Sequence, residues 1–144
     1  MFRDIKVITA DSTTGKISFS LFKCNDAIRD NKQALLQSIT LLLLNDKGSN
    51  SWDYTKGSSI ASLTGSTYSK GQEDVVKTLI SVGIKEIEKQ ILNERANTTF
   101  TGDELDGKLS SIEIMSIVYD EITAAWATTI LVKTASNNIG FITF

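Results

Sequence analysis

The 144-residue sequence contains no histidine and no proline, and its only cysteine is Cys24. Without histidine, the chain lacks the side chain that most often acts as a general acid or base near neutral pH and most often binds metals. A lone cysteine cannot form a disulfide within the chain, which fits a reducing compartment such as the cytoplasm. These absences predict no metal site, no cofactor and no enzyme, although carboxylates or lysine can still perform chemistry without histidine.

Long hydrophobic runs and an excess of one charge are also missing. The longest apolar run, residues 41–44, is far shorter than the roughly 20 residues that a membrane-spanning helix needs. Residues 1–6 lack the unbroken apolar stretch of a secretory signal. The 15 basic and 17 acidic residues give a net charge of −2 without a basic run. The sequence therefore predicts a water-soluble protein that binds neither nucleic acid nor membranes.

The composition is typical of one globular domain. Hydrophobic residues make up 41% and charged residues 22% of the chain, which is close to the averages of globular proteins. A chain of this length can bury about two thirds of the surface that it exposes when unfolded. No repeat, linker or low-complexity tail divides it, so we expect a single domain over residues 1–144.

Hydrophobic patterning predicts an α+β fold with an N-terminal β-hairpin. Residues 5–9 and 16–22 are strand-like and flank a turn-forming cluster that ends in Gly15. One helix is expected to begin at Asp30 or Asn31 and to stop in residues 45–48.

A second helix is expected from the capping-box pattern of Ser69 and Gln72 to the triplet at residues 93–95, with isoleucines at three- and four-residue spacing. Gly83 within this helix would allow the close approach of a strand or helix. Three strands follow, and we expect both helices to pack on this mixed or antiparallel sheet. The predicted strands cover residues 109–119, 128–134 and 139–144.

Two segments are candidate interaction surfaces. Residues 48–71 are rich in Ser, Thr, Gly and Asn and include Trp52 and Tyr54. Long loops of this kind are often functional; the alternative is a loop that Trp52 holds in place. The last predicted strand has apolar residues on both faces, and the sequence stops on Phe144. This strand is therefore expected either to be central or to pair at its edge with a neighbouring protein.

Motifs for catalysis or ligand binding are weak. The glycines of the long loop match neither common phosphate-loop motif. The acidic residues at 103–106 lack the ligand spacing and the closing glutamate of a calcium loop and are interpreted as a solvated turn. Asp46 and Asp53 remain an alternative as the paired carboxylates of a glycosidase.

The order of motifs in the middle of the chain is similar to that of a known family. Residues 33–49 lead into a loop with Tyr54 and Gly57, then into a long amphipathic helix and strands. This order resembles the baseplate wedge, or sheath-initiator, family of contractile phage tails, the lysozyme-like baseplate wedge family. In that family the long helix ends in Glu-Pro-Arg, whereas here the triplet is Asn93-Glu94-Arg95. Many members have an arginine after the glycine-serine turn, where this chain has residues 50–53.

The resemblance implies a structural subunit of a contractile phage tail baseplate, assembled in the host cytoplasm. Its partners would be other baseplate wedge subunits and the tail sheath protein, in a multi-copy symmetric assembly. It would seat the sheath through protein–protein contacts and β-strand addition. The expected interface residues are Glu94, Arg95, Trp52, Asp53, Tyr54, Phe141 and Phe144. For the helix-end and loop residues among them, the structural alternative is an ion pair or a loop anchor.

Two other functions fit parts of the same pattern. A tail completion or connector protein would share the strand-rich, charge-balanced composition, and it should form a ring when purified alone. A small peptidoglycan hydrolase would need a cleft in which Asp46 and Asp53 meet.

Overall fold

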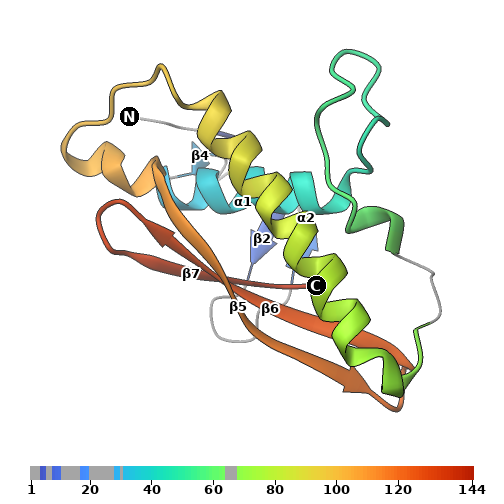
Figure 1. Cartoon of the computed structure of the whole chain (residues 1–144). Coiled ribbons are helices and arrows are strands. Elements are labelled where there is room, and N and C mark those ends of the chain that lie inside the picture. Colours follow the sequence, from blue (N-terminus) through green and yellow to red (C-terminus); the bar gives the residue numbers. More distant parts are fainter. Residues whose placement is uncertain (1–3, 6–7, 11–16, 20–27, 30, 64–67) are drawn as a thin grey trace.

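The computed structural model describes residues 4–5, 8–10, 17–19, 28–29, 31–63 and 68–144, with side chains described from Asn31 onward. Two helices pack on a three-stranded antiparallel sheet (Figure 1), which confirms the α+β prediction. Cys24 lies outside the described residues. In the part of the chain that the structure describes, no helix is both long and apolar enough to cross a membrane.

Short strands form two antiparallel pairs near the N-terminus. Strand β2 (Ile8–Ala10) pairs with β3 (Ile17–Phe19), so the strands of the predicted hairpin do lie together. The turn predicted between them lies outside the described residues. Strand β1 (Asp4–Ile5) pairs with β4 (Ile28–Arg29), a second pair that the sequence pattern did not predict.

The two helices begin and end close to the predicted positions. Helix α1 spans Asn31–Leu44 and helix α2 spans Glu73–Glu94. The capping box is present, with the Ser69 N–H donating to Gln72 Oε1 at 2.9 Å. It opens a 3-10 turn, η3 (Lys70–Gln72), which runs directly into α2. The isoleucine stripe of α2 is buried against α1 and the sheet, as its spacing predicted.

The sheet has the strand order β5-β6-β7. Its strands are β5 (Leu109–Asp120), β6 (Ala125–Thr134) and β7 (Ile139–Thr143). Strand β6 is central, and its buried Ile130 and Val132 lie opposite Ile142 and Ile112 of its neighbours. The two helices cover this face (Figure 1). The C-terminal strand is therefore an edge strand of the described sheet rather than a central one.

Two close contacts fix the sheet against the rest of the fold. A Cβ at Gly140 of β7 would lie 2.8 Å from Leu36 Cδ1, so glycine allows α1 to pack directly on this strand. The second contact involves Asp106 in the 3-10 segment η4 (Gly102–Gly107). Asn138 Nδ2 donates to Asp106 Oδ1 at 2.8 Å, and the Ser136 hydroxyl donates to the same oxygen. Asp106 thus connects η4 to the β6–β7 turn, a structural role beyond the solvated acidic turn that the sequence suggested.

Candidate protein-binding surfaces

A row of polar side chains on α2 holds the base of the loop between the helices. Glu86, Gln90 and Glu94 are four residues apart and so lie on one side of the helix. Glu86 Oε1 accepts a bond from Lys47 Nζ at 2.9 Å, and its Oε2 accepts bonds from the Ser59 backbone and hydroxyl at 3.2 and 3.1 Å. The Lys47 bond is the largest cause of the lowered pKa of Glu86. Glu86 thus holds the loop at one position on α2, and Gln90 and Glu94 hold it one and two turns further along the helix.

The middle contact of this row is a pair of hydrogen bonds to one glycine. Gln90 Nε2 donates to the Gly57 carbonyl at 2.6 Å, and the Gly57 N–H donates to Gln90 Oε1 at 3.1 Å. Gly57 has a φ of +103°, and a Cβ there would lie 2.5 Å from the Asn45 carbonyl oxygen. Only glycine fits this conformation without strain.

An apolar contact supports the same loop from inside. Ile60 is 7% exposed and lies over Gly83 of α2. A Cβ on Gly83 would overlap Ile60 Cγ1 and would lie 2.8 Å from its Cδ1. Gly83 does permit a close approach, but by a loop side chain and not by the strand or helix that was predicted.

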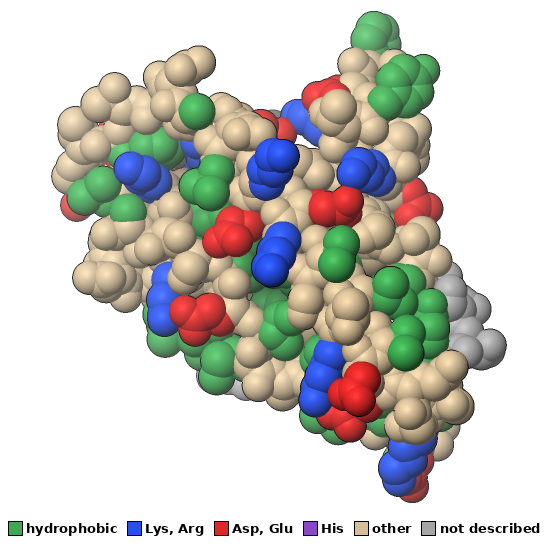
Figure 2. Space-filling view, viewed as in Figure 1, with side chains coloured by type: hydrophobic (Ala, Val, Ile, Leu, Met, Phe, Trp, Pro, Cys, Tyr) green, Lys and Arg blue, Asp and Glu red, His purple; other side chains and the backbone are tan. Residues whose placement is uncertain are grey.

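The tip of the loop presents two aromatic side chains to solvent. Trp52 is 95% exposed and Tyr54 is 70% exposed, so Trp52 does not anchor the loop. Asn50 Oδ1 accepts the Trp52 N–H at 3.0 Å, and Asp53 Oδ1 accepts the Thr55 N–H at 3.0 Å, so side chains order the tip locally. The loop projects from the body of the molecule (Figure 1), and hydrophobic side chains stand clear at its end (Figure 2).

Asp53 is an ionised carboxylate between these aromatic residues. Hydrogen bonds from the Thr55 hydroxyl and backbone N–H lower the pKa of Asp53, and Lys56 acts in the same direction. A glycosidase general acid instead needs a raised pKa. The lowered pKa of Asp53 is therefore the opposite of what the acid of a glycosidase requires. Neither Asp46 nor Asp53 lines either of the two cavities described below.

The two helix-end candidates both make contacts within the chain. Glu94 forms an ion pair with Lys56 at 3.0 Å, completing the polar row that holds the loop. Arg95 is half-buried, and its Nη1 donates to the Gly107 carbonyl in η4. Burial lowers the pKa of Arg95, while the adjacent Glu94 opposes this shift. These contacts are those of the structural alternative, in which Glu94 and Arg95 bind groups within the chain.

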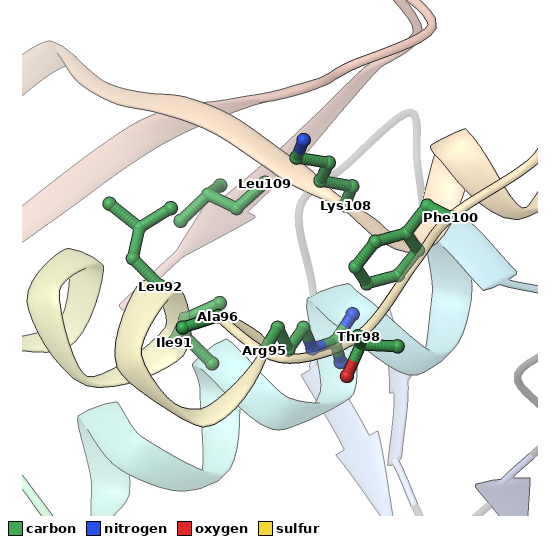
Figure 3. A pocket seen from close by; sticks show the side chains of 8 residues that line it. All are labelled: Ile91, Leu92, Arg95, Ala96, Thr98, Phe100, Lys108 and Leu109. Atoms are coloured by element: carbon green, nitrogen blue, oxygen red, sulfur yellow. The ribbon is translucent and has the colours of Figure 1, made fainter.

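A cavity of about 250 Å³ opens beside this helix end. Figure 3 shows Leu92 and Phe100 on opposite sides, with Leu109 and Lys108 along a third side. Lys108 is exposed and has no ion-pair partner among the described residues. The cavity therefore combines apolar side chains with polar ones, because Arg95 and Thr98 also line it, and the exposed ammonium group of Lys108 lies at its rim. A second hollow of about 370 Å³ lies between α2 and β5 and is lined by Lys77 and Glu73, which form an ion pair at 2.6 Å.

The third candidate surface is the outer edge of β7, which pairs with no other described strand and where Lys32 Nζ donates to the Ile139 carbonyl at 3.4 Å. Thr128 and Phe144 donate to each other's carbonyl at 2.7 and 2.9 Å. Bonded and non-bonded pairs alternate in antiparallel sheets, so Phe141, opposite Leu131, directs its backbone N–H and C=O away from β6. Phe144 is half-buried and packs against the core, with its backbone bonded to β6. Of the two predicted interface residues on this strand, Phe141 therefore has its backbone groups at the outer edge, whereas Phe144 packs against the core of the fold.

Of the three α2 residues that hold the loop, Glu94 was among the predicted site residues, whereas Glu86 and Gln90 were not. The four-residue spacing of Glu86, Gln90 and Glu94 is visible in the sequence, but such a row is equally typical of a solvated helix face. Their partners lie at least 27 residues away in the chain, so no local pattern connects them.

Comparisons with known proteins leave the family open. No protein-family model, curated protein or solved structure matches the chain.

Proposed function

We propose that this protein is a structural subunit of a contractile phage tail baseplate that binds wedge subunits and helps to seat the sheath by accepting a β-strand at the β7 edge. The observation that carries the proposal is the outer edge of β7, which pairs with no strand in the described part of the chain and where Phe141 directs backbone hydrogen-bonding groups away from β6. An added strand gains main-chain hydrogen bonds there, and side chains on both faces supply specificity.

The order of elements also supports the proposal. The resemblance implies a helix, a loop, a long helix with Glu and Arg at its end, and strands to the C-terminus. This is the order of α1, the loop, α2 and β5 to β7. Glu94 and Arg95 stand at the end of α2, where the family has its triplet.

The two edges of the sheet differ in their suitability for an added strand. Strand β5 has register shifts at residues 109–111 and 114–116. Irregularities of this kind disturb pairing and protect edges against added strands. Strand β7 pairs with β6 in unbroken register from Ile139 to Thr143, so its outer edge offers the more regular template.

The test is co-purification with the sheath and wedge proteins that neighbour this subunit in the tail, using a proline at the edge. Phe141→Pro removes an outward N–H and spares the hydrogen bonds between β6 and β7. Phe141→Val is the matched control, because it also shortens the side chain but keeps the donor. We expect the proline variant to lose at least about tenfold in affinity for the partner that adds a strand, and the valine variant to bind nearly as wild type.

Hydrogen exchange on the wild-type protein provides a second readout that does not depend on the variant's stability. The amides of Phe141 and Thr143 should become protected on binding, while those already bonded to β6 should change little. Equal binding of both variants, without new protection at Phe141, would exclude strand addition at β7. Retention of no wedge or sheath protein would exclude the baseplate role itself.

A further inference from the structure

Trp52 and the cavity beside the end of α2 have complementary chemistry. We propose that they form a contact between two copies of this chain, in which the loop tip of one copy inserts Trp52 into the cavity of the next. This contact goes beyond the proposed baseplate function, and it uses neither the β7 edge nor Phe141.

The size of the cavity suits one large side chain. Its volume of about 250 Å³ is below the roughly 300–1,000 Å³ of sites for drug-sized ligands. It exceeds the roughly 150 Å³ of an engineered apolar cavity that accepts benzene. An indole ring, slightly larger than benzene, falls between these limits.

The charges on the two sides are opposite. Asp53 follows Trp52 directly at the tip, and Lys108 lies at the rim of the cavity without an ion-pair partner in the described part of the chain. An inserted Trp52 would bring the carboxylate towards this ammonium group, and Lys108 can also stack over the indole face. The larger hollow beside β5 is a poorer receptor, because its Lys77 is already paired with Glu73.

The loop is built to present its tip rather than to rearrange on binding. Its base is held by Gln90 and Glu86, and Ile60 is seated over Gly83. The tip combines Ser, Asn and Tyr around a tryptophan, a composition that binding loops use for rigid aromatic anchors with adaptable polar neighbours. Preorganisation of this kind lowers the entropy cost of association.

Sedimentation of the full chain over a concentration series, up to about 1 mM, tests the contact with two complementary variants. Trp52→Ala removes the inserted side chain, and Leu92→Asp places a charge in the cavity wall. Both positions are exposed, at 95% and 45%, so both variants should fold as wild type does. We expect wild type to self-associate and each variant alone to do so at least about tenfold more weakly.

The mixture of the two variants is the decisive sample. Trp52→Ala keeps an intact cavity and Leu92→Asp keeps an intact tip, so together they can form one productive contact per pair. A heterodimer in the mixture, with monomers in each separate sample, would support the proposal. A wild-type chain that stays monomeric throughout, a Trp52→Ala variant that associates as wild type, or a mixture that stays monomeric would each overturn it.

Discussion

Replacing Gly83 by alanine should destabilise the protein, although alanine is the better helix former. At an open helix position this change stabilises by about 1 kcal/mol. Here the new methyl would overlap Ile60 Cγ1, which moves only by rotation about χ1, and this rotation is restricted in a β-branched residue. The loop must lift and expose Ile60, whose burial contributes roughly 1.5–3 kcal/mol. The net loss in the free energy of unfolding is therefore about 0.5–2 kcal/mol, which overlaps the usual range for overpacking.

Urea unfolding followed by circular dichroism measures this loss, and a second variant separates the clash from other effects. Ile60→Ala alone should cost about 2–4 kcal/mol. In the Ile60→Ala background the clash is gone, so Gly83→Ala should stabilise by up to about 1 kcal/mol. The sign of the Gly83→Ala effect thus reverses between the two backgrounds. Stabilisation by Gly83→Ala in the wild-type background would refute the contact between Ile60 and Gly83.

Three further predictions test other contacts. Gln90→Ala should cost about 1–2 kcal/mol through two lost hydrogen bonds and should speed hydrogen exchange at Gly57; unchanged exchange would contradict the role of Gln90. Gly140→Val should collide with Leu36 and cost about 1–3 kcal/mol in urea unfolding; wild-type stability would contradict close packing there. Hydrogen bonds lower the pKa of Asp106 from 3.8, so its stabilisation is present above pH 3.8 and is lost as the pH falls through the folded value. Asp106→Asn should flatten this part of the acid unfolding profile, and an unchanged profile would contradict it.

Regular elements were predictable because their signals are local. The isoleucines of α2 repeat at helical spacing, and the capping box of Ser69 and Gln72 marks the start of the segment that leads into it. The strands after residue 108 are rich in branched and aromatic residues. Strands β1 and β4 have two residues each, and a period of two cannot be recognised in so short a segment.

The candidate site was predictable in its residues but not in their roles. The sequence singled out Trp52 and Tyr54, yet an aromatic residue in a loop is equally consistent with an anchor and with an exposed contact. Its burial is decided by tertiary packing, and here Ile60 provides the anchor. Glu94 was predicted as an interface residue because it ends the helix, whereas its ion pair with Lys56 became evident only when the loop was placed beside α2.

Residues at the base of the loop stabilise the fold, whereas those at its tip are exposed to solvent. Gly57 and Ile60, at its base, are fixed to α2 by hydrogen bonds and burial, so their contacts stabilise the folded chain. Trp52 and Tyr54, at the tip, bury little surface in the monomer and contribute little to its stability. An exposed indole on an ordered loop gains free energy only when another surface covers it. The proposed insertion of Trp52 into a second copy would cover this indole, and it would leave the outer edge of β7 to the separate partner that we propose there.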